Sequence, residues 1–421
     1  MHPLDHQSME HAGRADTDWR RARRAAAWTE YDAAAMPTGK EEVWRYVELD
    51  IDLGDYVTGA EAPPMGDDGF AGLLPDAELL AVVNGVATGT ATDHLMPLRQ
   101  ALDERADAAS VAAGAALPAA TDIFAAAHDA FGGDGAFVHV TKGVVAPTVH
   151  IDVQTTAEGT ASFPAVWINA EEGAEVSVVV HLRSSDGLGA MTIPQFGAYV
   201  GPGANVRLTL VQRNAYGVTS FGHAGVTLDR DASIRLFEVG LGGGHSRLHL
   251  DTRLEGNGSS ANVVGAYFGE DTQTLDYRYF MHHVGTNTRS DMFLKGAVED
   301  EADSVFTGLI RIEETGQKTE AFQTNRNLLL SDGATAQSVP NLEILANDVR
   351  CGHGSTVGPL DSEQRYYLMS RGLDRPRADR VQVRGFFEEV LSKLPEPALA
   401  DPIRGWFNAK YESAQLQGRV R

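Results

Sequence analysis

The sequence predicts a mainly β protein whose core is a β-helix, with helical segments before and after that core. Three observations support this prediction. Apolar and polar residues alternate as in strands from Gly135 to about Leu345. Small residues open successive strands of this stretch at a nearly constant spacing. Helix-compatible apolar stripes lie on both sides of it. We therefore expect a mostly helical region over 1–131, a β-helix core over 132–358 and a helical region over 359–421.

The N-terminal region is expected to contain three helices. An alanine-rich segment over 18–35 has apolar residues at helical spacing and ends before Pro37. Two more helices are predicted over 97–108 and 120–131, the second of which stops at a Gly-Gly pair. The first 15 or so residues are expected to be disordered. The segment 54–75 is rich in Gly, Pro and Asp, which is typical of a loop.

The β region repeats with a period of about 28–30 residues. Each strand of the series opens with a small residue after an acidic or glycine turn. These residues are Ala174, Ala204, Ala232, Ser260 and Ser290, and then, after one irregular step, Ala302 and Ala334. Such recurrence is typical of a solenoid, and no helical pattern interrupts it as βαβ units would require. A sandwich or jelly roll with a strand every 8–12 residues is the alternative fold.

Three helices are predicted near the C-terminus. Asp361 and Gln364 form a capping box before a helix that ends at Gly372. Two apolar stripes at helical spacing follow, separated by prolines. The first consists of Val383, Phe386, Phe387, Val390, Leu391 and Leu394, and the second of Leu399, Ile403, Trp406, Phe407 and Tyr411. Helices in this place can cap the open core of a solenoid or offer a docking face.

The charge of the chain excludes some classes of partner. Fifty-eight Asp and Glu residues oppose 35 Lys and Arg residues, which gives a formal net charge of −23. Such a surface does not suit nucleic acid, whose binding depends on neutralised phosphates, or an anionic membrane. It is typical of a protein that stays soluble in high salt, so we favour a salt-loving host over an acidic binding function.

The single cysteine, the N-terminal sequence and the lack of long apolar stretches indicate the cellular compartment. One cysteine cannot form an internal disulfide, which suits a reducing compartment. The N-terminus has no apolar run typical of a signal peptide, and no stretch approaches 18 apolar residues. We therefore expect a cytoplasmic protein.

The lone Cys351 and the nearby His353 are the candidate site residues. They lie in the sequence "VRCGHGS", where we expect a loose glycine-rich loop that leaves both side chains free. Thiolate and imidazole suit iron, zinc or iron–sulfur clusters, but two ligands do not complete a site, so a partner would have to supply the rest. The alternatives are a buried structural cysteine and, less favoured, a Cys–His nucleophile pair.

Other chemistry-bearing patterns are weak. His245 and His249 have the spacing of a helical metal pair, but their segment has the alternation of a strand, in which they would lie about 13 Å apart. His223, His282 and His283 are scattered. No phosphate-binding loop and no common hydrolase motif is present, so we expect no nucleotide to be bound by this chain.

Much of the chain resembles the SufB/SufD family of iron–sulfur cluster assembly scaffolds. The similarity is strongest between Phe280 and Gly372, and it weakens over 1–36 and 54–120. The matching pieces, in order, are "HHVGTNTRSDMFLKGAV", "VFTGLIRI", "GQKTEAFQTNRNLLLSDGA", "PNLEILANDVRCGHGSTVG" and "LDSEQRYYLMSRGL".

This resemblance implies a right-handed parallel β-helix between helical segments, in a cytoplasmic complex. A SufB-like and a SufD-like subunit would pair through their β-helices, and each would bind a SufC-like ATPase with its C-terminal helices. The chain itself would be a non-enzymatic scaffold. A transient iron–sulfur cluster would form near the shared interface, with His353 and Cys351 as ligands from this chain.

The resemblance favours the SufD-like paralogue. The SufB-like cysteine before the "LL" of "NRNLLLSD" is absent here, where Asn325, Arg326 and Asn327 stand, and "DVRCGHG" is similar to the SufD-like signature. A SufB-like homodimeric scaffold, a homodimer of the isolated chain and a cytoplasmic β-helix carbohydrate-active enzyme are the alternatives.

Overall fold

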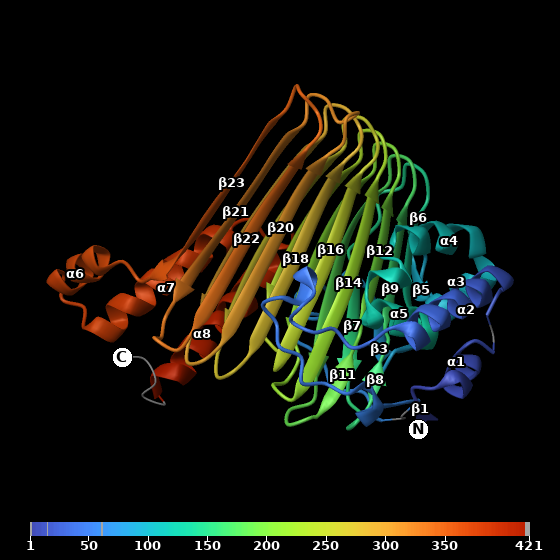
Figure 1. Ribbon diagram of the computed structural model, residues 1–421, viewed down its shortest axis with the longest axis horizontal. Helices are drawn as coiled ribbons and strands as arrows, with labels where there is room; N and C mark the ends of the chain where they lie inside the picture. The colour runs from blue at the N-terminus through green and yellow to red at the C-terminus, as the bar shows by residue number, and fades with distance from the viewer. Residues whose placement is uncertain (1, 15, 60–61, 417–421) are drawn as a thin grey trace.

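Two long sheets of parallel strands form the body of the molecule (Figure 1). The structure, a computed structural model, describes every residue except 1, 15, 60–61 and 417–421. One sheet has ten strands and the other eleven, and the chain alternates between them as it winds along the solenoid. The predicted parallel β-helix is confirmed. The sandwich or jelly roll alternative is wrong, because those folds are built from antiparallel strands.

The strands lengthen along the solenoid to a regular ten residues. The first sheet consists of β4 (Val86–Thr88), β3 (Glu78–Val83), β7 (Val149–Thr155), β10 (Glu175–Ser184), β13 (Asn205–Arg213), β15 (Ser233–Gly240), β17 (Ser260–Gly269), β19 (Arg289–Val298), β21 (Glu320–Leu329) and β23 (Arg350–Pro359). The second consists of β5 (Leu95–Pro97), β6 (Gly135–Val140), β9 (Ala165–Ala170), β12 (Gln195–Val200), β14 (Val218–Leu228), β16 (His245–Leu254), β18 (Thr274–His283), β20 (Asp303–Ile312) and β22 (Thr335–Ile344), with β8 (Ala161–Ser162) and β11 (Ala190–Thr192) beside it.

Inward-facing side chains of both sheets fill the solenoid. Equivalent residues on neighbouring strands stack into ladders, because the parallel register repeats from strand to strand. One fully apolar ladder consists of Val178, Leu208, Leu236, Val263 and Met292. Alternate residues of the same strands point outward, so strands that are covered by helices are buried on both faces.

The register corrects part of the repeat assignment. Ala174, Ala204 and Ala232 occupy equivalent buried positions, as predicted. Ser260 and Ser290 do not, because the register pairs Ser260 with Ser233 and Ser290 with Ala261. The corners between strands differ in length, and this shifts the series by one or two residues. Ala302 and Ala334 are equivalent to each other but precede strands of the second sheet, which explains the irregular step.

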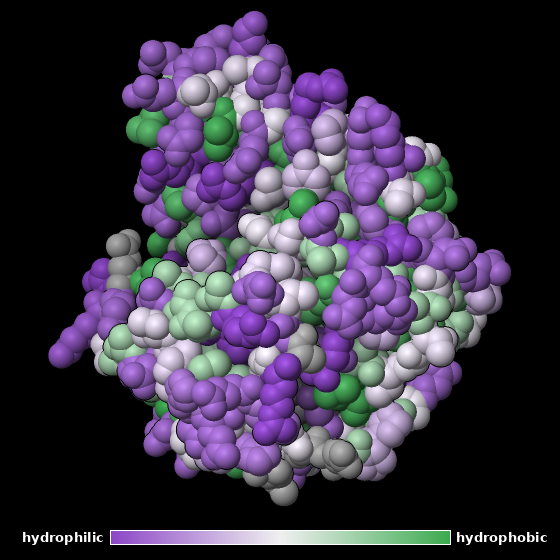
Figure 2. Space-filling model, turned by 90° about the vertical axis from the view of Figure 1, so that its right-hand side faces the viewer, coloured by the Kyte–Doolittle hydropathy of each residue, from purple (hydrophilic) through white to green (hydrophobic). Residues whose placement is uncertain are grey.

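The first 131 residues contain strands as well as helices. The helices are α1 (His6–Ala12), α2 (Asp18–Ala33), α3 (Leu98–Glu104), α4 (Ala106–Ala115) and α5 (Ile123–Phe131). The helices predicted over 18–35 and 120–131 match α2 and α5, and 97–108 spans α3 and the start of α4. The expected disorder of the first residues is wrong for α1, which Asp5 caps through the backbone N–H of Ser8. Figure 2 faces this end of the molecule, whose surface is mostly hydrophilic with scattered hydrophobic residues.

Two of the three C-terminal helices, α7 and α8, lie along the outer face of the first sheet. The three helices are α6 (Ser362–Ser370), α7 (Arg375–Leu391) and α8 (Ala400–Leu416). The predicted stripes of α7 and α8 bury against outward-facing residues such as Phe237, Val264 and Phe268. These helices therefore do not cap the end of the solenoid. The helix α6, which buries none of its residues, projects from the body (Figure 1).

Candidate functional site

The last turn of the solenoid ends in two exposed edge strands. Within the described residues, β22 and β23 pair with β20 and β21 on one side and have no strand on the other. We call these two strands the open end. Each is ten residues long, and none of their residues is fully buried. Backbone groups along both outer edges are consequently available to a neighbouring strand.

Cys351 and His353 lie on β23, and not in the loose loop that the glycines suggested. The strand pairs in regular parallel register with β21 over all ten residues. Gly352 and Gly354 do not have a positive φ, so the backbone here makes no use of glycine's conformational freedom. On a strand, residues two apart point to the same face, with their Cα atoms about 7 Å apart.

Both residues continue inward-facing ladders of the solenoid. Cys351 follows Ala321, and His353 follows Gln323 on the ladder that begins with the apolar residues described above. Cys351 is partly buried and packs against the core, whereas His353 is exposed. The two side chains therefore face the interior at its open end, where a second chain could reach them.

The protonation of Cys351 limits what the chain does alone. Burial raises the pKa of the Cys351 thiol above its usual value, and the thiol is free. A metal ligand has to be a thiolate. Cys351 therefore needs an added positive charge, from a metal ion or a partner, before it can act as a ligand at neutral pH.

Behind these residues lies a polar layer that the sequence reasoning missed. Gln323, Asn325 and Asn327 on β21 point inward and are almost fully buried. Asn327 donates a hydrogen bond to Asn325 (2.8 Å) and accepts one from Tyr267 (2.5 Å). The Gln323 side-chain oxygen and the Asn325 side-chain nitrogen have no partner among the described atoms. Alternating polar residues in "FQTNRNL" were the available signal, because period-two positions share a face.

The other candidate histidines lie elsewhere. His223 contacts Asp122, the N-cap of α5, at 3.0 Å, and its ring lies near that of His249 on the neighbouring strand. His245 packs against Phe221 on the same sheet. His283 points inward and contacts the hydroxyls of Thr288 and Ser290, both at 2.8 Å, whereas His282 lies 3.2 Å from Asp251. The structure does not join any of these to Cys351 and His353 in one ligand group.

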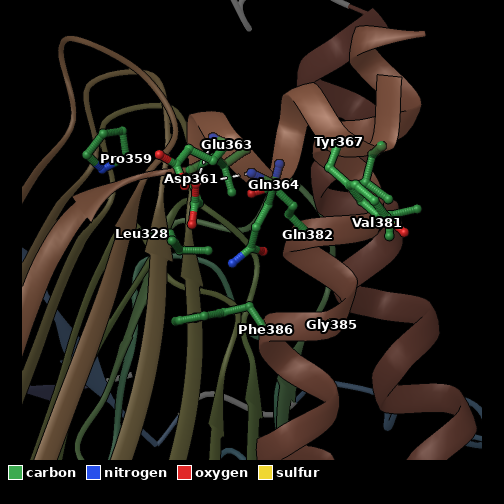
Figure 3. Close-up of a pocket in the computed structure, with 12 residues that line it drawn as sticks. Leu328, Pro359, Asp361, Glu363, Gln364, Tyr367, Val381, Gln382, Gly385 and Phe386 are labelled. Atoms are coloured by element: carbon green, nitrogen blue, oxygen red, sulfur yellow. Dashed lines mark hydrogen bonds between the residues drawn. The ribbon is translucent and has the colours of Figure 1, made fainter. Parts of the chain in front are cut away.

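A groove separates the end of β21 and β23 from the C-terminal helices (Figure 3). It encloses about 740 Å³ and is lined mainly by apolar surface of β21, α6 and α7, including Leu328, Tyr367 and Phe386. Asp361 fixes one wall by accepting hydrogen bonds from the backbone N–H groups of Glu363 and Gln364. This is the predicted cap of α6. Tyr367, in the wall of the groove, and its neighbour Tyr366 are both largely exposed.

A comparison with protein-family models shows which family the chain belongs to. Residues 153–386, more than half of the chain, match the model described as SUF system FeS cluster assembly, SufBD core domain. The chain belongs to the SufBD family. This match runs from the last residues of β7 through β21, both edge strands of the open end and the first part of α7. The resemblance drawn from the sequence motifs is confirmed.

Individual relatives agree with this family and with its SufD branch. The chain is 34% identical over 270 residues to an iron–sulfur cluster assembly SufBD family protein of Mycobacterium tuberculosis, covering 62% of this chain and 66% of that protein. It is 30% identical to the SufD proteins of Escherichia coli and Bacillus subtilis, over 63% and 64% of this chain and 60% and 62% of theirs. The matched part thus spans about two thirds or less of these relatives. Among the described residues, no helix is long and apolar enough to cross a membrane.

Proposed function

We propose that this protein is a non-enzymatic, cytoplasmic scaffold subunit of a Suf-type iron–sulfur assembly complex, in the SufD-like role. It pairs with a SufB-like subunit through the open end and binds a SufC-like ATPase through its C-terminal helices. The observation that carries the proposal is the position of Cys351 and His353. Both lie on an edge strand of a SufBD-family solenoid, where another subunit can complete their ligand set.

The edge strands support pairing with a second solenoid. Long, flat, unprotected edges are templates for strand addition, and natural proteins usually protect the edges that they do not use. Here the open end also exposes the large apolar side chains of Ile344 and Val357, and Phe322 on the adjoining strand β21 is exposed as well. Burying them against a similar sheet edge would stabilise a complex.

The nascent cluster is the cargo of this site. His353 is exposed and its imidazole is a ligand for iron, whereas Cys351 joins it only after losing its proton. Two ligands from one chain leave the remaining positions to the partner. His353 therefore carries the first contact with iron, and Cys351 follows.

The groove of Figure 3 supports the ATPase assignment. It lies between the strand ends and the helices α6 and α7, and the exposed ring of Tyr367 lines it with that of Tyr366 nearby; aromatic residues are enriched in binding surfaces. The ATPase would supply the nucleotide chemistry of the complex, since this chain carries no phosphate-binding loop motif.

Anaerobic co-expression with the SufB-like and SufC-like subunits tests the proposal. The substitution His353→Ala is expected to leave folding and subunit co-purification intact and to abolish the visible absorption of the assembled cluster. His6→Ala, which changes an exposed histidine on α1, is the control and should keep cluster assembly. Normal assembly by the His353→Ala complex would contradict the site assignment.

A homodimer of this chain is the second candidate, because the same open end can pair with a copy of itself. Sizing of the isolated protein, with and without the SufB-like subunit, separates the two assemblies. The carbohydrate-active enzyme considered from the sequence has no support from the family match.

A further inference from the structure

The buried side chain of Gln323 lies next to His353 in a ladder of inward-facing residues. The parallel register of β21 and β23 pairs the two residues, so their side chains leave strands about 4.8 Å apart in the same direction. Gln323 is 2% exposed, whereas His353 is exposed at the open end. The Gln323 amide therefore lies directly behind the exposed imidazole.

One hydrogen bond fixes which way the Gln323 amide points. Its nitrogen Nε2 donates to the backbone carbonyl of Asn341 on β22, at 3.3 Å. Because only the NH₂ group of an amide can donate to a carbonyl oxygen, this bond assigns Nε2 to the side of Asn341. The oxygen Oε1 lies against Gly308 on β20, where the Cβ of any other residue would collide with it. Gly308 thus leaves the space that the amide occupies.

The Gln323 oxygen Oε1 has no hydrogen-bond partner among the described atoms. A buried acceptor of this kind usually has one, and its absence is costly. On one side of the ladder the neighbour of Gln323 is Met292, which has no donor to offer. On the other side it is His353, whose neutral imidazole carries one N–H group. The two groups are neighbours, but the free chain does not make the bond between them.

Histidines that bind a metal use a partner of this kind. A histidine that ligates through one ring nitrogen almost always donates the N–H of the other nitrogen to an oxygen acceptor or water. This second contact fixes the tautomer and the orientation of the ring, and it raises the basicity of the ligating nitrogen. An unpaired oxygen beside an exposed imidazole is the arrangement that such a contact requires.

We propose that Gln323 is a positioning residue for His353. When one ring nitrogen of His353 takes iron at the open end, the other nitrogen donates its N–H to Gln323 Oε1. The contact satisfies the buried oxygen and holds the imidazole in one tautomer and one orientation. This inference rests on the proposed function, because it concerns the iron ligand that the function assigns to His353.

Cobalt binding to the pair formed with the SufB-like subunit tests the inference, with Co²⁺ as the substitute for Fe²⁺. Competition with a chelator measures the affinity, and only the binding that His353→Ala removes is counted. We expect Gln323→Met, which keeps the length of the side chain but removes the acceptor, to weaken this binding by at least about 10-fold. Gln323→Glu restores an acceptor oxygen and is expected to bind cobalt nearly as well as the unaltered pair.

A second measurement follows the hydrogen bond itself. In the pair loaded with diamagnetic Zn²⁺, nuclear magnetic resonance of ¹⁵N-labelled histidine detects the ring N–H of His353. We expect its proton to exchange slowly with water in the unaltered pair and rapidly in Gln323→Met, a difference that a packing role alone would not produce. Should Gln323→Met fail to fold or pair, the unaltered pair decides, because slow exchange supports the inference and rapid exchange overturns it.

The control is Asn325→Leu, which changes another inward-facing amide of β21 that has an unpaired atom. The register pairs Asn325 with Ser355 and not with His353, so this change should leave cobalt affinity unaltered. Equal weakening by Asn325→Leu and Gln323→Met, or unchanged affinity in Gln323→Met, would overturn the inference and leave the proposed function standing. Absence of cobalt binding, or an affinity that His353→Ala does not change, removes the site assignment together with the inference.

Discussion

The two ends of the solenoid treat their edge strands in opposite ways. At the N-terminal end, the edge strands β4 and β5 are three residues long and run antiparallel to their neighbours. Pro97, in β5, has no N–H to donate, and α3 and α4 pack against the adjacent strands. At the C-terminal end, β22 and β23 are ten residues long, parallel and exposed.

This difference shows which end of the solenoid is protected against pairing with a further strand and which is not. Short, antiparallel and proline-containing edge strands discourage strand addition, so the N-terminal end is protected against it. The open end keeps the features that favour addition and places the only cysteine and an exposed histidine on it. These are the features that the proposed shared assembly site requires.

The largest expected effect comes from placing a charge at the open end. Val357→Lys should abolish pairing with the SufB-like subunit, because pairing would bury an unpaired ammonium, at a cost of about 3–5 kcal/mol. That cost corresponds to a loss of at least about 100-fold in affinity. Co-purification and sedimentation of the subunit pair measure it.

The matched control lies at the other end. Val86 on β4 is 57% exposed, compared with 42% for Val357, and Val86→Lys should pair normally. Loss of pairing by Val86→Lys, with pairing retained by Val357→Lys, would reverse the comparison between the ends.

Core packing should decline toward the open end. Leu294→Ala, in the fully buried middle of β19, is expected to lower the free energy of unfolding by about 3 kcal/mol through the cavity it leaves. Leu342→Ala, on the partly buried β22, should cost less than about 1 kcal/mol in the unpaired chain. Chemical denaturation compares the two, and equal losses would show that the last turn is packed as tightly as the middle.

Glu238 is a buried acid in the well-packed middle of the solenoid, and it makes the stability of this region depend on pH. Burial raises the pKa of Glu238 well above its usual value, with an opposing contribution from the Tyr279 hydroxyl at 3.4 Å. The folded chain therefore keeps this proton to a higher pH than the unfolded chain does, and stability falls as pH rises through that interval. Glu238→Gln should be more stable than the unaltered chain at neutral pH and similar below the usual glutamate pKa of about 4.3. A stability difference that does not change with pH would contradict this account.

The smallest effect concerns the Cys351 thiol. Because burial raises its pKa, its alkylation by iodoacetamide should be half-maximal at a higher pH than that of a cysteine peptide. In the folded chain the thiol stays protonated as pH rises, so its contribution to stability is lost above the unfolded pKa. Mass spectrometry of the alkylated fraction across pH measures this, and a midpoint at or below the peptide value would be inconsistent with a desolvated thiol.

The sequence predicts the repeating fold well, because alternation and small strand-opening residues are local signals. It does not predict the register from Ser260 onward, since the corner lengths vary by a few residues. It also misses β23, whose glycines weaken the strand pattern while the neighbouring β21 supplies the pairing. The apolar stripes of α7 and α8 can be recognised in the sequence, but the sequence does not show which surface of the solenoid they cover.

Two groups of functional side chains in this molecule also differ in how much of each the sequence reveals. Cys351 and His353 are only two residues apart in the sequence, so a short pattern and a family resemblance suffice to select them as candidates. The polar alternation around Gln323 is also visible, but its place beside His353 is not. That place depends on the register between β21 and β23, which the length of the corners between them sets and which no local pattern encodes.

Hydrogen–deuterium exchange of the chain, alone and with the proposed SufB-like partner, tests the central claim most directly. The account predicts that pairing slows exchange in Thr335–Ile344 and Arg350–Pro359, and leaves Val86–Thr88 and Leu95–Pro97 unchanged. Protection confined to the N-terminal strands, or no change at the open end in a stable complex, would contradict it.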